Sequence, residues 1–304
     1  MATILIGGGT GLIGQQLSKL LTDRKHSVRL LSRSTSDKNQ YPVFKWDVIA
    51  GQIDEDALDG IDYIINLAGA GIADKAWTDK RKKLIIDSRV KGNELLVETL
   101  KRRNQKVKAF ISSSAVGYYG DRGDEKLPES AAPGNDGFLS ESCMLWEASA
   151  RKAVPVCNRL VIIRTGVVLS TKGGALEKML IPFYFGMSNY FGDGTAYMPW
   201  IHIDDIARLF IKAVEEEKME GTFNGVAPES VTGKEMAIAI KKAKDSFALV
   251  MPVPEFALKI TMGERVTMLT NSNNVIPKET MAAGFNYEHP DLILALKDIL
   301  KEKK

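Results

Sequence analysis

A glycine-rich segment at residues 7–14 carries the first sequence pattern that points to chemistry. It reads Gly-Gly-Gly-Thr-Gly-Leu-Ile-Gly, and it fits GxxGxxG through Gly8, Gly11 and Gly14 or GxGxxG through Gly9, Gly11 and Gly14. In both alignments the glycines permit a tight turn, let the backbone approach a pyrophosphate and allow a helix to pack closely on a strand. The free N–H groups at the start of the following helix are suited to bind phosphates.

The surroundings of this segment favour a dinucleotide site. An apolar strand pattern precedes it and an amphipathic helix pattern follows it, which is the context that the motif requires. A glycine-rich turn without a ligand is the alternative. The residues that we expect to contact the dinucleotide here are Gly8, Thr10, Gly11, Leu12, Ile13 and Gly14.

The end of the second expected strand indicates which dinucleotide binds. NAD sites commonly have an acidic residue there, which hydrogen-bonds the ribose hydroxyls, whereas an NADP site uses arginine. This chain has Ser32 and Arg33 at that position, and the next acidic residue is Asp37. A guanidinium can form two parallel hydrogen bonds with a 2′-phosphate. The sequence therefore predicts NADP(H), with an ordinary exposed arginine as the alternative.

The elements that must position these residues alternate between strand and helix. Short apolar segments at 3–6, 27–31, 43–46, 63–67, 108–112 and 160–164 are separated by helical patterns. Strands that are apolar throughout are typical of a parallel sheet covered on both faces. We therefore predict an α/β fold, a Rossmann-type doubly wound parallel sheet with a smaller mixed α+β C-terminal lobe.

The composition changes after about residue 166, which suggests how the chain is divided. Glycine, proline and aromatic residues become dense, and a helix at 205–217, a strand at 222–226 and a last helix from about residue 290 follow. Thr232 and Glu235 have the spacing of a capping box. We predict a dinucleotide-binding domain at 1–166, to which about 200–227 returns, and a smaller substrate-type lobe at 167–304.

Composition limits the classes of partner. The 304 residues carry a net charge of only +3, from 41 basic and 38 acidic side chains, so nothing indicates nucleic acid. Cys143 and Cys157 have no ligand-type spacing, which predicts no metal and suits a reducing compartment. No apolar stretch reaches about 18 residues and no signal peptide is recognisable. We expect a cytoplasmic protein without a membrane span that binds a small-molecule substrate.

Several motifs together resemble the extended short-chain dehydrogenase/reductases. These are the glycine segment, "NLAGAG" at 66–71, "ISSSAVGYYG" at 111–120 and "WIHIDDIA" at 200–207. The likeness is to a subgroup of atypical NAD(P)-dependent epimerases with a small C-terminal domain of undefined role, which "VPEFALKITMGE" at 253–264 fits. The resemblance implies a homodimer through helices at about 82–102 and 140–153.

The resemblance also implies where the cofactor lies. Leu67, Ala68 and Gly69 would line the path of the adenine ribose and the pyrophosphate. Asp47 would lie near the adenine, and Gly166 with Val167 would lie near the nicotinamide.

The family's chemistry uses a serine that holds the substrate oxygen, a tyrosine that transfers the proton, and a lysine four residues later that lowers the pKa of the phenol. The resemblance places Ser114 at the serine. Glu147 fits an acidic residue found four positions after the lysine, which puts Cys143 at the lysine position and Leu139 at the tyrosine position. Neither can perform that role. Tyr118 and Tyr119 remain as candidates for the acid, with packing residues as the alternative.

Two functions follow from this incomplete set. The first is an NADP-dependent oxidoreductase or epimerase acting on a small polar substrate, such as a sugar or nucleotide sugar. The second is a non-catalytic NADP(H)-binding reader or interaction protein.

Four further residues allow two interpretations each. His202 is a general acid, or it anchors the segment before a helix that Asp204 or Asp205 caps. Arg164 meets an anionic substrate or forms a structural ion pair, and Arg89 reaches the cleft or a carboxylate. Cys143 is a reactive thiol or an inert buried one.

Overall fold

An eight-stranded sheet forms the centre of the protein in the computed structural model, which describes residues 1–34, 40–135 and 137–301. The strand order is β13-β8-β6-β5-β1-β2-β3-β4, and every neighbouring pair is parallel except β3 and β4. The strands are β1 (Thr3–Gly7), β2 (Ser27–Ser32), β3 (Val43–Asp47), β4 (Gln52–Ile53), β5 (Tyr63–Asn66), β6 (Val107–Ala115), β8 (Cys157–Thr165) and β13 (Gly221–Gly225). The predicted α/β doubly wound sheet is confirmed.

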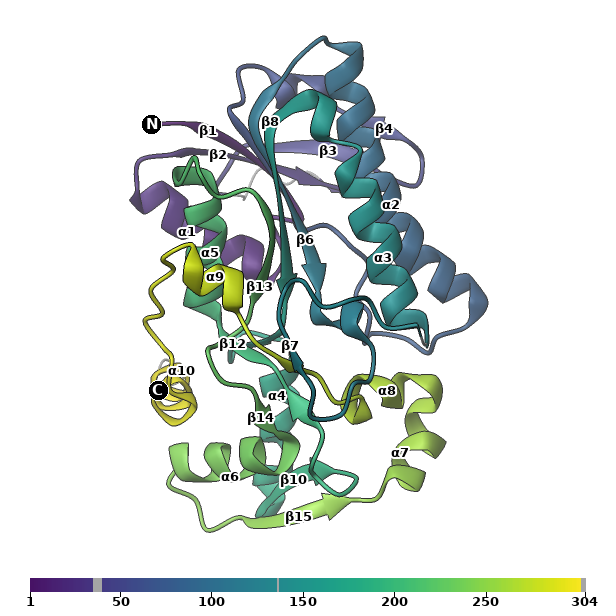
Figure 1. Ribbon diagram of the computed structural model, residues 1–304, viewed down its shortest axis with the longest axis vertical. Coiled ribbons are helices and arrows are strands. Elements are labelled where there is room, and N and C mark those ends of the chain that lie inside the picture. The colour runs from purple at the N-terminus through teal and green to yellow at the C-terminus, as the bar shows by residue number, and fades with distance from the viewer. Residues whose placement is uncertain (35–39, 136, 302–304) are drawn as a thin grey trace.

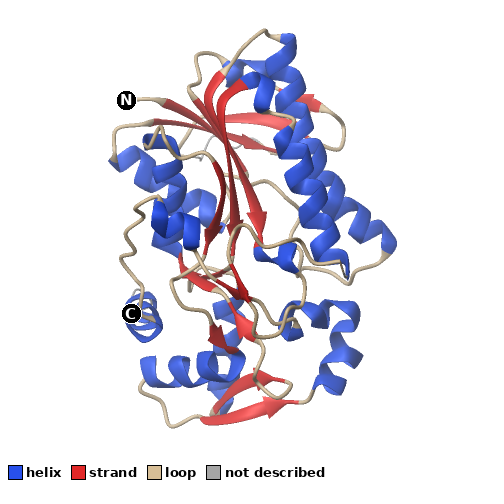
Figure 2. Cartoon of the chain, viewed as in Figure 1, coloured by secondary structure: helices blue, strands red, loops and turns tan. Residues whose placement is uncertain are grey.

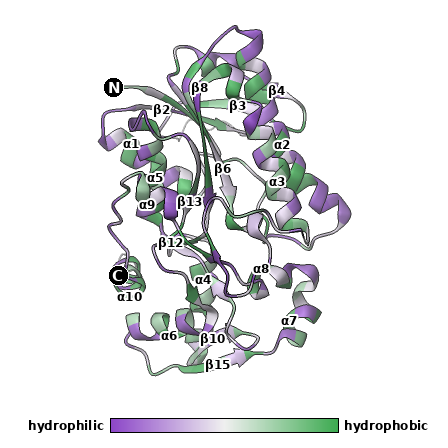
Figure 3. Cartoon of the chain, in the orientation of Figure 1, coloured by the Kyte–Doolittle hydropathy of each residue, from purple (hydrophilic) through white to green (hydrophobic). Residues whose placement is uncertain are grey.

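Helices cover both faces of this sheet. Helices α1 (Leu12–Asp23) and α5 (Ile203–Glu215) cover one face, and α2 (Asp79–Arg102) and α3 (Gly137–Arg151) cover the other (Figure 1). Figure 2 shows the strands running between the two helical layers. Because successive side chains of a strand point to opposite faces, Ile4 and Ile6 pack toward α1 and α5, whereas Leu5 packs toward α2. Burial on both faces explains why the strands are apolar throughout, and Figure 3 shows hydrophobic colours along them.

A smaller layer of elements lies beyond the carboxyl ends of the strands (Figure 1). Its core joins the apolar faces of α4 (Ala175–Leu180), α6 (Gly233–Ala243) and α10 (Leu292–Lys301) around Trp200. Its short strands pair as β9 (Val167–Leu169) with β12 (Trp200–His202), β10 (Met187–Phe191) with β15 (Leu249–Val253), β11 (Tyr197–Met198) with β14 (Val231–Thr232), and β7 (Lys126–Leu127) with β16 (Asn274–Val275). The remaining helices are α7 (Glu255–Met262), α8 (Thr267–Thr270) and α9 (Lys278–Ala282). Short 3₁₀ turns are η1 (Glu55–Leu58), η2 (Val116–Tyr119), η3 (Val154–Val156), η4 (Ile181–Phe185) and η5 (Gly263–Val266).

The chain returns to the central sheet after this layer has begun. Strand β13 pairs with β8 at the edge of the sheet, and α5 packs beside α1. The capping box of Thr232 and Glu235 at the start of α6 is confirmed. The prediction that Asp204 or Asp205 caps α5 is wrong, because His202 Nδ1 itself accepts the hydrogen bond from the Asp204 N–H at 3.1 Å. None of the helices in the described part of the chain combines the length and the apolar character that crossing a bilayer requires.

Candidate cofactor and active site

The glycine loop between β1 and α1 is folded back tightly on itself. Gly8 has φ +77°, in the left-handed region that favours glycine, and a Cβ there would lie 2.9 Å from the Ala68 nitrogen. A Cβ on Gly14 would lie 2.5 Å from the Gly8 carbonyl oxygen. The Gly11 N–H donates to that same oxygen at 3.0 Å. The loop therefore needs glycine at positions 8 and 14 for its own packing.

The middle glycine differs, because it faces open space. A Cβ on Gly11 would have one neighbour within 4 Å, the Gly8 oxygen at 3.3 Å. Gly11 is also the N-cap of α1, no side chain caps this end, and the first turn contains no acidic residue. The loop thus offers a bare backbone surface and free N–H groups at the positive end of a helix, which is the chemistry that a phosphate requires.

Strands β1 and β5 part at their carboxyl ends, which is where doubly wound sheets bind dinucleotides. Gly7 and Asn66 are paired at the ends of these strands, and the chain leaves them in opposite directions, which makes this the switch point of the sheet. Asn66 accepts a hydrogen bond from the Ala68 N–H at 3.2 Å and donates to Asn93 Oδ1 at 2.7 Å. This buried amide pair fixes the turn at Leu67, Ala68 and Gly69 against the glycine loop.

The two predicted sites for the adenosine half lie at neighbouring strand ends. Ser32 ends β2 and Arg33 follows it with an exposed side chain, while Asp37 lies outside the described residues. Asp47 ends β3, where its carboxylate accepts the N–H groups of Ile49 and Ala50, both at 3.0 Å. Asp47 therefore stabilises its own turn.

Ser114 lies in a buried polar network rather than at an open surface. Its hydroxyl donates to Glu147 Oε1 at 2.9 Å. Arg164 donates to the same carboxylate, from Nε to Oε1 at 2.7 Å and from Nη2 to Oε2 at 3.0 Å. The side chains of Glu147 and Arg164 are only 1% and 3% exposed. Of the two interpretations of Arg164, the structure therefore shows the structural ion pair.

The two tyrosines after Ser114 belong to the same network. Tyr119 is completely buried, donates to Asn224 Oδ1 at 2.7 Å and accepts from Arg164 Nη1 at 3.0 Å. Burial raises the pKa of Tyr119, and the neighbouring Arg164 only partly offsets this. The Arg164 guanidinium also stacks on the Tyr118 ring, with its Cζ 3.5 Å from the ring centroid. Tyr119 thus packs in the interior, and the partly buried Tyr118 packs against the same cluster, as the alternative interpretation expected.

A cleft of about 270 Å³ lies beside Gly166 and Val167. Leu139 and Cys143, which stand at the tyrosine and lysine positions of the resemblance, both line it. Ser114, Tyr118 and Tyr119 are not among its lining residues. The fold thus brings the expected nicotinamide-binding residues to a cleft, but it does not bring the three expected catalytic residues there.

Together, these features describe a loop of phosphate-binding type at the switch point of the sheet and a cleft beside Gly166. The sequence matches the NAD dependent epimerase/dehydratase family over residues 4–224. The chain belongs to this family. Residues 253–299 also match a domain of unknown function, DUF1731.

Relatives with the same length support this assignment to the epimerase family. Epimerase family protein SDR39U1 of Mus musculus is 35% identical over 300 residues, covering 98% of this chain and 99% of that protein. Epimerase family protein YfhF of Bacillus subtilis is 34% identical over 304 residues, covering 99% of each.

Solved structures of the epimerase family have the same fold. A crystal structure of human SDR39U1 with NADPH has a TM-score of 0.88 at 34% identity, covering 98% of this chain and 99% of that one. A nucleoside-diphosphate sugar epimerase from Corynebacterium glutamicum has a TM-score of 0.79 at 31% identity, covering 98% of this chain and 58% of that one.

The free thiol of Cys143 lies buried on the lining of this cleft. Burial raises the pKa of Cys143 to about 11, although the positive charge of Arg89 opposes this. The thiol is therefore protonated at neutral pH and is a poor nucleophile. It supplies neither the positive charge of a lysine nor a reactive thiolate.

Two features of the cleft have no signal in the sequence. Thr165 ends β8, is buried, and its Oγ1 has no hydrogen-bond partner within the described residues. Met268 and Leu269 reach the cleft from α8, about 100 residues away from Gly166 in the chain. Long-range contacts of this kind leave no local pattern that sequence reasoning could find.

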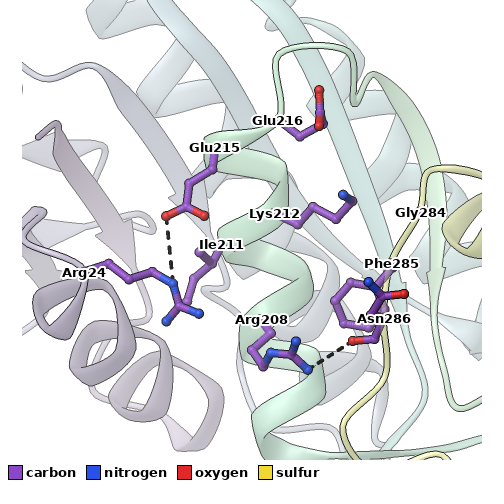
Figure 4. A pocket seen from close by; sticks show the side chains of 9 residues that line it. All are labelled: Arg24, Arg208, Ile211, Lys212, Glu215, Glu216, Gly284, Phe285 and Asn286. Atoms are coloured by element: carbon purple, nitrogen blue, oxygen red, sulfur yellow. Dashed lines mark hydrogen bonds and ion pairs between the residues drawn. The ribbon is translucent and has the colours of Figure 1, made fainter.

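A second, shallow pocket lies on the outer side of α5 and holds mostly paired charges. Arg24 forms an ion pair with Glu215 at 3.9 Å, and Arg208 donates a hydrogen bond to the Asn286 carbonyl oxygen at 3.1 Å. Both interactions are marked in Figure 4. It is remote from the glycine loop, and we assign it no chemistry.

Three ligand-type side chains also meet near the start of α5. Ligand atoms of His202, Asp204 and His289 lie within 4.8 Å of one another. The two imidazole rings are stacked, with centroids 3.7 Å apart and planes 24° apart. Ring lone pairs lie in the ring planes, so nearly parallel stacked rings do not point at one common ion.

Proposed function

We propose that this chain binds NADP(H) between β1 and β5 and performs redox chemistry on a small molecule held in the cleft beside Gly166. The observation that carries the proposal is the open backbone surface at Gly11, which faces the free end of α1. The NADPH in the human relative's crystal structure and the exposed Arg33 at the end of β2 support the choice of the phosphorylated cofactor.

Each part of the site has a proposed role. The free N–H groups of Leu12 and Ile13 bind the pyrophosphate against the open backbone of Gly11, and Arg33 pairs with the 2′-phosphate. Gly166 and Val167 contact the nicotinamide. A bound nicotinamide supplies or accepts a hydride when a carbonyl or alcohol lies beside it.

The proton must come from a group other than the family's usual tyrosine. Ser114 donates to the buried Glu147, and Leu139 has no proton to give. The cleft lining contains one phenol, that of Tyr197, and one hydroxyl without a partner, that of Thr165, within the described residues. We propose that Thr165 positions the substrate oxygen and that Tyr197 or a water molecule exchanges the proton.

A second function is supported by the buried polar network. Because Ser114 and Tyr119 are committed to the buried network, the chain is suited to bind NADP(H) without turning over a substrate. Screening carbonyl compounds for NADPH oxidation separates the two functions. Turnover supports the oxidoreductase, and tight cofactor binding without turnover across a broad panel supports the reader.

Titration with NADPH and NADH, followed by nicotinamide fluorescence, tests cofactor binding itself. A methyl group at Gly11 occupies the phosphate surface, so Gly11→Ala should weaken NADPH binding by about tenfold or more, which is about 1.4 kcal/mol. Gly92→Ala is the control, because its Cβ makes only ordinary contacts, at 3.6 Å and beyond. Arg33→Asp should reverse the preference for NADPH over NADH. Failure of the wild-type protein to bind NADPH contradicts the proposal, as does an unchanged preference in Arg33→Asp.

A further inference from the structure

The cleft beside Gly166 has an apolar lining that comes from both halves of the chain. Val116, Leu139 and Trp146 form one wall. Phe191, Met198 and Met268 contribute from the smaller layer. An apolar lining of this kind gains free energy by burying apolar ligand surface, and its few polar groups then decide how the ligand is oriented.

Arg89 is the one charged residue on this lining among the residues that the structure describes. It lies on α2, and its guanidinium is held by hydrogen bonds from Nη1 to the carbonyl oxygens of Ala70 at 3.1 Å and Ile85 at 3.0 Å. Its Cζ lies 5.0 Å from the centre of the Trp146 ring. The side chain is thus fixed in place at the edge of the cleft.

The guanidinium has an unused pair of donors and no counter-ion. Neither Nε nor Nη2 has a hydrogen-bond partner in the described ranges, and no described carboxylate lies within 4.0 Å of Arg89. Burial lowers the pKa of Arg89, which reflects the cost of holding this charge away from water. Nε and Nη2 together form the edge that binds a carboxylate through two parallel hydrogen bonds.

Gly69 leaves room for this arrangement. A Cβ at Gly69 would lie 3.0 Å from Arg89 Cζ and 3.2 Å from Nε. A larger residue would therefore push the guanidinium from its place. Glycine at position 69 therefore lets the Arg89 guanidinium keep its place, in addition to leaving space for the proposed path of the cofactor.

These contacts do not favour the sugar or nucleotide sugar that the sequence suggested. A diphosphate carries at least two negative charges, and proteins bind it with several cations or N–H groups, whereas this lining has a single guanidinium. A sugar ring needs many hydrogen-bond partners, whereas the polar side chains of this lining, such as Thr165 and Tyr197, are outnumbered by apolar ones such as Leu139 and Met268.

We infer that the cleft binds a small apolar molecule that carries one carboxylate, and that Arg89 pairs with that carboxylate. The inference rests on the proposed function in one respect. If the nicotinamide lies at Gly166, the carbon of this ligand that reacts must lie near Gly166 as well. Arg89 selects the substrate by its charge, and the apolar walls select it by its shape.

Matched probes test the inference by calorimetry or ligand-observed NMR, with and without NADP⁺. The probes are 3-phenylpropanoate, the equally shaped but neutral 3-phenylpropanamide, and UDP-glucose. The wild-type protein should bind the acid more tightly than the amide and should bind UDP-glucose least. Arg89→Met should weaken binding of the acid by about tenfold or more and leave binding of the amide nearly unchanged. Arg102→Met, on the exposed end of the same helix, is the control.

Other results overturn the inference. Equal binding of the acid and the amide by the wild-type protein does so even if Arg89→Met fails to fold. Absent binding of the acid, or tighter binding of UDP-glucose, does so as well. A tenfold loss of NADPH affinity in Arg89→Met, with binding of the acid retained, assigns the guanidinium to the cofactor instead.

The same titrations separate this inference from the proposed function. If the acid binds through Arg89 but NADPH does not bind, the ligand class stands and the cofactor proposal fails. If NADPH binds but the acid does not, the cofactor proposal stands and the ligand class fails.

Discussion

Arg164 and Glu147 form a bidentate ion pair in the interior, with Nε 2.7 Å from Oε1 and Nη2 3.0 Å from Oε2. Arg164 comes from β8 and Glu147 from α3, so the pair joins the sheet to a helix on one of its faces. Burial alone lowers the pKa of Arg164, but the hydrogen bonds and charge of Glu147 reverse this and raise the pKa above its usual value. The acidic residue that follows the family's lysine by four positions thus has a structural role here.

Removing the charge of Glu147 should strongly destabilise the protein. Glu147→Gln leaves the Arg164 guanidinium buried without its counter-ion, and the free energy of unfolding should fall by about 3–5 kcal/mol. Urea denaturation followed by circular dichroism measures this change. Glu141→Gln, at an exposed position of the same helix, should change it by less than about 0.5 kcal/mol. A similarly small effect of Glu147→Gln would show that the pair adds nothing to stability.

Ser114 should behave as a member of this pair's network. Ser114→Ala removes one hydrogen bond to a buried carboxylate, so unfolding should become easier by about 1.5–3 kcal/mol. NADPH affinity should stay the same, because Ser114 does not line the cleft. Parallel urea and NADPH titrations measure both quantities. A stable variant that no longer turns over a carbonyl compound reduced by the wild-type protein would instead assign Ser114 to catalysis.

Local sequence patterns predicted the fold and the tight turn of the glycine loop. The apolar strands and the glycine loop depend on residues a few positions apart, such as Gly8 and Gly14, so their signal lies within one segment. The catalytic expectations depend on distant partners. Ser114 meets Glu147 33 positions away, and Tyr119 meets Asn224 105 positions away. No pattern in the sequence indicates such partners, so only the structure shows where these side chains point.

The two critical glycines of the loop should respond differently to substitution. A Cβ at Gly14 would lie 2.5 Å from both the Gly8 oxygen and the Gly9 Cα, which are backbone atoms that cannot easily move. Gly14→Ala should therefore lower the free energy of unfolding by about 1–3 kcal/mol and also impair NADPH binding. Gly11→Ala should mainly affect binding. Thermal melting and NADPH titration of both variants check this, and equal melting temperatures would contradict it.

Both cysteines should resist thiol reagents in the folded protein. Burial raises the pKa of Cys143 to about 11 and also raises the pKa of Cys157, so neither forms much thiolate at pH 8. Labelling with a chromogenic disulfide should be slow in buffer and rapid for both thiols in urea. If one thiol reacts fast, labelling of the Cys157→Ser variant shows whether that thiol is Cys143 or Cys157. Rapid labelling of Cys143 in the native protein would show that the cleft activates this thiol.

The imidazole of His202 should make stability depend on pH. The ring is 2% exposed, its Nδ1 caps α5, and its Nε2 has no hydrogen-bond partner among the described residues. Burial, followed by the charge of the stacked His289, lowers the pKa of His202 below its usual 6.5, although Asp204, Asp205 and Asp298 oppose this.

The sign of the effect follows from which state binds the proton. Below about pH 6.5 the unfolded chain takes up a proton on this ring that the folded chain does not, so the free energy of unfolding should fall as the pH falls from that value. Urea denaturation between about pH 8 and pH 5 measures the slope. His202→Asn keeps an acceptor at the N-cap but removes the titration, and its slope should be shallower than that of the wild-type protein. Identical slopes in the two proteins would mean that other groups, and not His202, set the acid sensitivity.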